Sequence, residues 1–210
     1  MSHYYDENPE VESDESLFTY SYDNHDLELV TDAGVFSKGK IDFGSDLLVK
    51  TFLKTYPPGP TKNIIDVGCG YGPIGLMIAK VSPHHEVTMV DVNQRALNLS
   101  RKNKKRNRID NVKVKESDGL SQVEDNTYDF VLTNPPIRAG KEVVHRILED
   151  AYVKLKLDGE LFVVIQKKQG MPSAKKKMQD TFDNVEVLEK SKGYYILRSV
   201  KGWLSSCILI

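Results

Sequence analysis

NIIDVGCGYGPIG, residues 63–75, is the segment from which the fold of this chain can be predicted. Its apolar beginning, residues 64–67, is typical of a buried strand in a parallel sheet. Alternating glycines from Gly68 to Gly72 then permit a tight turn, positive φ angles and close approach of the backbone to a ligand. Pro73 suits the first turn of a helix. The segment therefore predicts a strand, a glycine turn and a helix in succession.

A second apolar segment, residues 87–91, ends in Asp91. A glycine turn followed by a strand that ends in a carboxylate is an arrangement that binds a nucleoside, with the acid on the ribose hydroxyls. Asp66 distinguishes between cofactors, because it would repel the pyrophosphate of a dinucleotide and attract the ammonium of S-adenosylmethionine (SAM). Asn134-Pro135-Pro136-Ile137, after an apolar run, also favours SAM. A dinucleotide site and a glycine turn used only for packing are the alternatives.

Length and composition fit one α/β domain of a soluble protein. The chain has 210 residues, of which 40% are hydrophobic and 28% charged. A net charge of -1 argues against a protein that coats nucleic acid through bulk charge. Two cysteines provide neither a disulfide framework nor a zinc cluster, so we expect no metal. Without a membrane span or a signal-peptide pattern, we expect a cytoplasmic protein that does not bind membranes.

Strands that alternate with helices predict a Rossmann-like, doubly wound α/β fold with a mostly parallel seven-stranded sheet. A C-terminal antiparallel hairpin, formed by residues 185–188 and 194–197, is expected to close it. Before the sheet, the chain predicts an acidic and flexible segment at 1–16 and a hairpin with a substrate-side loop at 17–45. Residues 46–203 form the SAM-dependent domain, and 204–210 a tail whose Cys207-Ile208-Leu209-Ile210 only formally fits a prenylation box.

Three local features lead to narrower expectations. Ser45 is expected to cap the helix that carries Leu47 and Leu48. A short core strand is expected at residues 161–165. The histidines have no metal-ligand spacing and are expected at the surface; they are His84, His85 and His145.

Ligands of a doubly wound sheet lie beyond the carboxyl ends of its strands. That edge is expected to bring together Asp66 and the glycines, Asp91, Asp118 as the residue that reads adenine, and Asn134. The alternatives without a ligand are that Asp91 and Asp118 are ordinary turn acids and that Asn134 is an asparagine that starts a turn. Cys69 is expected to be a small packing residue of the turn rather than a nucleophile. The predicted cofactor-binding residues are Asp66, Gly68, Cys69, Gly70, Gly72, Asp91, Val92, Asp118, Gly119 and Asn134.

The Asn-Pro-Pro turn predicts the catalytic chemistry. An exocyclic amino group is a poor nucleophile because its lone pair is delocalised. Hydrogen bonds from this group to the Asn134 oxygen and to a carbonyl, expected to be that of Pro135, would aim it at the SAM methyl. Pro135 and Pro136 stiffen the turn, so that the two acceptors stay in place. The predicted catalytic residues are therefore Asn134, Pro135 and Pro136.

With these motifs the chain resembles the class I SAM-dependent methyltransferases, whose first and fourth motifs match residues 66–72 and 134–137. More closely it resembles the RsmC-like family of small-subunit rRNA guanine-N2 methyltransferases, also through residues 34–37, 41–45 and 138–141. The resemblance implies SAM as cofactor, a methyltransferase domain at 46–203, and methylation of the guanine amine in RNA. The substrate-binding residues expected on this basis are Phe36, Asp42, Phe43, Ile137, Arg138 and Lys141.

Two departures from that family affect the substrate. Its larger members carry a second, degenerate half before the catalytic one, where this chain has only a short acidic extension. RNA placement would then rely on this domain or on a partner. Many Asn-Pro-Pro enzymes also have an aromatic residue where this chain has Ile137, and Phe36 or Phe43 would have to supply a stacking face unless both are core residues.

Clusters of basic residues form two candidate surfaces for binding RNA. Residues 101–108 are either a solvated helix end or a phosphate-binding surface, and Lys167-Lys168 with Lys175-Lys176-Lys177 form a second candidate. Other acceptors would be a glutamine side chain in a protein or adenine in DNA, because both expose planar amines. A non-catalytic RNA-binding module with a vestigial SAM fold is the alternative outside enzymes.

Overall fold

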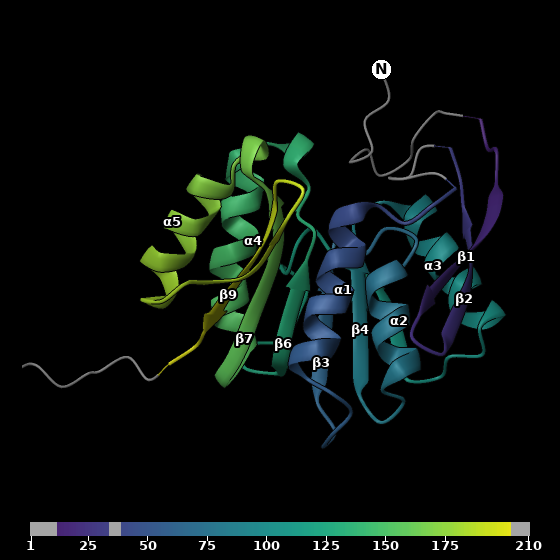
Figure 1. The fold of residues 1–210 in the computed structure, drawn as a ribbon, viewed down its shortest axis with the longest axis horizontal. Helices are drawn as coiled ribbons and strands as arrows, with labels where there is room; N and C mark the ends of the chain where they lie inside the picture. The colour runs from purple at the N-terminus through teal and green to yellow at the C-terminus, as the bar shows by residue number, and fades with distance from the viewer. Residues whose placement is uncertain (1–11, 34–38, 203–210) are drawn as a thin grey trace, which may run out of the picture.

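The computed structural model describes residues 12–33 and 39–202, and the strand predicted from the glycine-turn segment lies in the interior of its main sheet. This strand, β3 (Asn63–Val67), pairs in parallel with β4 (Glu86–Asp91) and with β6 (Tyr128–Thr133). The remaining strands of the sheet are β5 (Val112–Glu116), β7 (Leu155–Gln166), β8 (Glu186–Ser191) and β9 (Tyr194–Val200). Their order, β5-β4-β3-β6-β7-β9-β8, confirms the predicted seven-stranded sheet with its C-terminal antiparallel hairpin (Figure 1).

Helices cover both faces of this sheet. One face packs against α1 (Phe43–Thr55), α2 (Pro73–Val81) and α3 (Gln94–Arg106), and the other against α4 (Lys141–Lys154) and α5 (Met171–Phe182). Successive strand residues point to opposite faces, so Ile64 belongs to the first hydrophobic core and Ile65 to the second. Short 3-10 helices, η1 (Ile137–Ala139) and η2 (Lys167–Gln169), follow β6 and β7.

The predicted N-terminal hairpin is present and packs against α3. Its strands, β1 (Ser16–Tyr22) and β2 (His25–Thr31), form a separate two-stranded sheet beside that helix (Figure 1). Asn103 of α3 accepts a hydrogen bond from the Val30 amide at 2.8 Å and donates one to the Val30 carbonyl at 2.9 Å. One turn later Asn107 does the same with Glu28, at 2.9 and 2.8 Å. The side-chain amides of Asn103 in α3 and of Asn107 at its C-cap thus make the hydrogen bonds along β2 that a partner strand would make.

Two narrower expectations are wrong, and one predicted strand is longer than expected. The N-cap of α1 is Asp42, whose side chain accepts a hydrogen bond from the Ser45 amide, and Ser45 lies inside the helix. Strand β7 begins at Leu155, not at residue 161, because the chain stays paired with β6 across an irregularity around Asp158 and Gly159. His85 is buried, and its Nδ1 accepts a hydrogen bond from the Lys62 amide.

Candidate active site

The glycine turn is open on one side and tightly packed on the other. Gly68, Gly70 and Gly72 have φ angles of 71°, 59° and 95°, which other residues rarely adopt. Gly68 is exposed, and no atom lies within 4 Å of the position that a Cβ would take. At Gly72 a Cβ would lie 2.8 Å from Cε of Met89. The open side at Gly68 is where a ligand can reach the backbone.

Asp66 lies beneath the turn with one carboxylate oxygen unsatisfied. Its Oδ2 accepts a hydrogen bond from the Gly75 amide at 3.0 Å, whereas its buried Oδ1 has no partner among the described residues. Burial, with a smaller contribution from Asp91, raises the pKa of Asp66 to about 7. A cationic group at the turn would supply the missing donor, so this acid fits the ammonium of SAM.

Asp91 is buried and oriented by the backbone. Its Oδ2 accepts a hydrogen bond from the Gly70 amide and its Oδ1 one from the Asn93 amide, both at 2.9 Å. Burial raises the pKa of Asp91, and these amides oppose the shift. The carboxylate therefore joins the end of β4 to the glycine turn, and each of its oxygens keeps a lone pair for a further donor.

Cys69 is buried in the first core, with Sγ 3.8 Å from Oγ of Ser100. Burial raises the pKa of its thiol well above the ordinary value, so the thiol stays protonated and is a poor nucleophile.

The remaining predicted cofactor residues lie at the ends of β4 and β5. Val92 is half-buried directly after Asp91. Asp118 is exposed, and its Oδ1 lies 2.6 Å from NH2 of Arg146 on α4. Gly119 follows in a left-handed conformation, with φ of 57°. The topology therefore brings these residues to the carboxyl edge, while Asp118 has a basic partner that the sequence did not indicate.

Asn134 follows β6 at the same edge, and its amide has a fixed orientation. Its Nδ2 donates hydrogen bonds to Oδ1 of Asp42 at 3.2 Å and to Oγ of Ser45 at 3.1 Å. Because a carboxylate only accepts, the nitrogen must face α1 and the carbonyl oxygen Oδ1 is left for another donor. The Thr133 hydroxyl donates to the Val67 carbonyl at 2.9 Å and joins this turn to β3.

The prolines form the buried part of the turn. The Pro136 carbonyl accepts a hydrogen bond from the Ala139 amide at 3.0 Å, which closes η1. The Pro135 carbonyl accepts none from the residues that the structure describes. Two acceptors on consecutive residues of the turn, the Asn134 Oδ1 and the Pro135 carbonyl, are therefore without a donor from residues 12–33 and 39–202.

The predicted substrate residues separate into packing and exposed groups. Phe43 is half-buried and packs on Tyr194, with ring centroids 5.5 Å apart, while Nζ of Lys192 lies 4.7 Å from its ring centroid. Ile137 packs against the second core, whereas Arg138 and Lys141 are exposed. Asp42 caps α1 and holds Asn134. Phe36 and the rest of 34–37 lie outside the described residues, as does Cys207-Ile208-Leu209-Ile210.

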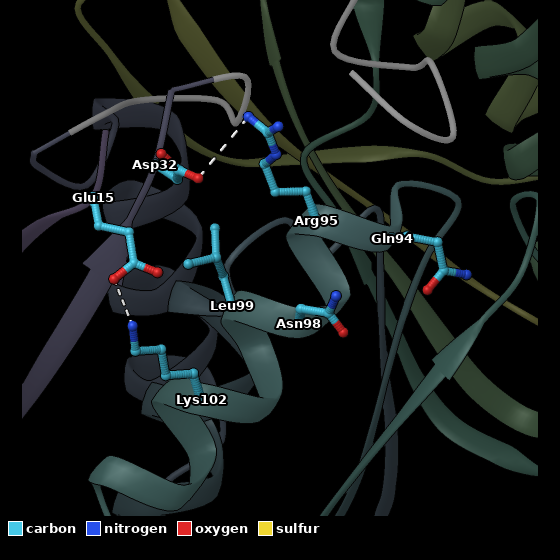
Figure 2. Close-up of a pocket in the computed structure, with 7 residues that line it drawn as sticks. All are labelled: Glu15, Asp32, Gln94, Arg95, Asn98, Leu99 and Lys102. Carbon is cyan, nitrogen blue, oxygen red and sulfur yellow. Dashed lines mark hydrogen bonds and ion pairs between the residues drawn. The ribbon is translucent and has the colours of Figure 1, made fainter. Parts of the chain in front are cut away.

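A cavity of about 300 Å³ lies between the N-terminal segment and α3. Figure 2 shows its acids next to its bases: Asp32 lies 3.9 Å from Arg95, and Glu15 lies 2.5 Å from Lys102. Its acids and bases are paired, and none of the predicted catalytic or cofactor residues lines it. We assign no catalytic role to this cavity.

Residues 12–33 and 39–202 contain neither a candidate metal site nor a candidate membrane span. No group of three or more histidine, cysteine, aspartate or glutamate side chains there could hold a metal ion. No helix in these ranges is long and apolar enough to cross a membrane.

Sequence reasoning missed the role of Asp42 and Ser45 in holding Asn134. Both residues belong to the segment 41–45, which carries part of the family resemblance, so the signal was present as a motif. The contact itself was invisible, because 92 residues separate Asp42 from Asn134.

Comparison with known proteins agrees with this geometry. The family model described as the methyltransferase small domain matches residues 26–198. The uncharacterized protein YbxB of Bacillus subtilis is 48% identical over 200 residues, covering 95% of this chain and 98% of YbxB. The ribosomal RNA small subunit methyltransferase C of Cronobacter sakazakii is 31% identical, over 92% of this chain and 55% of that protein.

A similar solved structure is the Thermus thermophilus 16S rRNA N2 G1207 methyltransferase (RsmC) in complex with AdoMet and guanosine. It has a TM-score of 0.80 and 24% identity, over 92% of this chain and 52% of that one. The chain thus spans about half the length of these rRNA methyltransferases. From its fold, its motifs and this match, the chain belongs to the methyltransferase small domain family and is an RsmC-like class I SAM-dependent methyltransferase.

Proposed function

We propose that this protein transfers a methyl group from SAM to the exocyclic amino group of guanine in ribosomal RNA. The observation that carries the proposal is the orientation of the Asn134 amide. Its nitrogen is occupied by Asp42 and Ser45, at 3.2 and 3.1 Å, so its oxygen is the group available to an incoming amine. An amine that donates both its hydrogens finds the Pro135 carbonyl as its second acceptor.

The residues of the turn fit the cofactor. Asp66, with its unsatisfied Oδ1, would hold the ammonium, and the open backbone at Gly68 would lie along the methionine part. Asp91 would bind the ribose hydroxyls, and Val92, Asp118 and Gly119 would surround the adenine. Bound SAM supplies an activated methyl group on a sulfonium ion.

The protein's contribution is positioning rather than strong base catalysis. Two hydrogen bonds from the amine, to the Asn134 Oδ1 and to the Pro135 carbonyl, would hold it so that its nitrogen lone pair, which is perpendicular to the base plane, faces the methyl group. Bound SAM would supply that methyl group with its thioether sulfur as the leaving group, and the amine would give up one proton to solvent. Fixed acceptors cost no reorganisation when charge develops on the amine, which is the usual advantage of a preorganised site.

Ribosomal RNA as substrate is supported by similarity to proteins of that activity. The relative from C. sakazakii is named for it, and the T. thermophilus structure holds guanosine together with the cofactor. Because this chain matches only about half of each, its substrate and target nucleotide have to be measured.

The test is to incubate the pure protein and tritiated SAM with cell RNA, with DNA and with cell protein, in three separate reactions. We expect label in RNA, and N2-methylguanosine after digestion to nucleosides and mass spectrometry. Label in a protein glutamine or in DNA adenine would contradict the proposed substrate while keeping the chemistry of the turn. Absence of SAM binding in calorimetry would contradict the proposal as a whole and favour a non-catalytic module.

A further inference from the structure

We propose that this protein contacts the phosphates of its RNA through a basic rim around Asn134, and not through the basic end of α3. The inference rests on the proposed RNA substrate. The basic rim consists of five exposed cations from three separate connections: Arg138, Lys141, Lys167, Lys168 and Lys192.

The topology places all five at the catalytic edge of the sheet. Strands β3, β6 and β7 are parallel, so the connections after β6 and β7 begin at the edge where Asn134 lies. Arg138 and Lys141 belong to the first connection, and Lys167 and Lys168 to the second. In the antiparallel pair of β7 and β9, Gln166 is opposite Tyr194, so the turn with Lys192 reaches the same edge.

Contacts join the second and third connections to each other and bring the third next to the residue that holds Asn134. The Lys167 amide donates to the Gly193 carbonyl at 2.8 Å, which fixes the β8–β9 turn against the end of β7. Lys192 lies over the ring of Phe43, and the preceding residue, Asp42, binds Asn134. The basic rim therefore lies at the same edge of the sheet as the position where the target amine would sit.

The cations of the basic rim are available to a polyanion. None of the five forms an ion pair with a carboxylate of the described residues, and all five are exposed. Glu142, an exposed acid in the first turn of α4, lies among them, and the rim keeps a surplus of positive charge. Clustered and unpaired cations beside a base-modifying site suit the phosphates that flank a target nucleotide.

The basic end of α3, residues 101–108, has a different setting. Helix α3 runs from the carboxyl end of β4 back to the start of β5, so these residues lie towards the opposite edge of the sheet. Lys102 pairs with Glu15, and Arg106 with Glu28 at 3.0 Å. The asparagines between the basic residues bind β2. The segment with the densest positive charge in the sequence, residues 101–108, is therefore not the surface that we propose for the phosphates.

Two charge-matched variants test this inference. The rim variant is Arg138→Gln, Lys167→Gln and Lys168→Gln, and the matched α3 variant is Arg101→Gln, Lys104→Gln and Lys105→Gln. Each loses one arginine and two lysines, and glutamine keeps most of the length of each side chain. Binding of fluorescein-labelled, protein-free small-subunit rRNA is measured by anisotropy at several salt concentrations, together with SAM affinity by calorimetry.

We expect the rim variant to bind this RNA about tenfold or more weakly, with a salt slope reduced by about 2 to 3, and with SAM affinity unchanged. The α3 variant should stay within about twofold of the parent protein, the scatter expected without a phosphate contact. Equal losses in both variants, a larger loss in the α3 variant, a loss of SAM affinity in the rim variant, or no RNA binding by the parent protein would each overturn the inference. RNA binding that depends on the rim, without methyl transfer, would support it and contradict the proposed function.

Discussion

Asn134 and Asn103 are two asparagines held by similar contacts and suited to different tasks. Asn103 is fully buried, and its amide group is used up by backbone: its oxygen accepts from Val30, and its nitrogen donates to the carbonyls of Val30 and of Tyr71 at 2.9 Å. Asn134 is half-buried, and among the described residues only its nitrogen has hydrogen-bond partners. The fold supplies hydrogen-bond partners for both the oxygen and the nitrogen of the Asn103 amide. It orients the Asn134 amide through the nitrogen and leaves the oxygen for another donor.

This difference distinguishes an asparagine that stabilises the fold from one that can bind a ligand. A buried amide with every hydrogen bond made stabilises the fold and offers nothing to a ligand. An amide with one side fixed presents the other side in a known direction, which is the preorganisation that a reacting amine requires. Asp66 resembles Asn134 in this respect, because one of its oxygens is bound and the other has no partner among the described residues.

The largest expected effect is on transfer by Asn134→Ala. Loss of the fixed acceptor should lower kcat about 10²- to 10³-fold, the range found when one preorganised hydrogen-bonding group is removed. SAM affinity in calorimetry and the free energy of unfolding should stay close to those of the parent protein. An equal loss of SAM affinity and of transfer would show that the turn is structural.

Asn103→Ala should have the opposite pattern. Removing three hydrogen bonds leaves buried backbone groups unpaired and should lower the free energy of unfolding by about 3 kcal/mol, measured by urea denaturation. The kcat of the folded fraction should change little. Asn107→Ala is the matched control; because Asn107 is only half-buried, water can replace its contacts, and the cost should be about 1 kcal/mol. A greater cost for Asn107→Ala would contradict this comparison.

A smaller effect is expected when the orientation of Asn134 is loosened. Asp42→Ser keeps a good N-cap for α1, but serine is too short to reach the amide, so kcat should fall about tenfold with little change in stability. In Asp42→Asn, one oxygen can still accept from both Ser45 and Asn134, and kcat should recover to within a few-fold. If both variants lost kcat equally, the charge of Asp42 and not its geometry would be what matters.

The smallest effect concerns the pH dependence of SAM binding through Asp66. Its pKa, raised to about 7, means that the native protein without ligand holds a proton where the unfolded chain has lost it. The stability that this group contributes is therefore complete at low pH and is lost as pH rises through 7. A cation binds the ionised form, so SAM affinity should increase with pH below 7, by up to about tenfold per pH unit.

Calorimetry at pH 6 and at pH 7 measures this dependence. The matched control is Asp66→Asn, which should bind SAM more weakly and with little change over the same range. Equal SAM affinity of the parent protein at the two pH values would exclude Asp66 as the partner of the ammonium.

Local patterns were sufficient for the elements around the glycine turn. The strand at residues 63–67, the glycines with positive φ and the helix that begins at Pro73 were predicted, because each depends on neighbouring residues alone. The order of strands and helices then predicted which residues share the carboxyl edge. Strand β7 was predicted too short because Asp158 and Gly159 look like a turn, whereas the residues on either side of them pair with β6 and their own backbone exchanges hydrogen bonds with Lys201.

Tertiary contacts decided what the sequence left ambiguous. The sequence predicted Ser45 as the cap of α1, whereas Asp42 is the cap, and both residues bind Asn134, far along the chain. The basic run at 101–108 was predicted to be either a solvated helix end or a phosphate-binding surface, and the structure shows that the asparagines within it bind β2. Periodicity and turn chemistry act between near neighbours, whereas the direction of an amide and the partners of a charge depend on segments that only folding brings together.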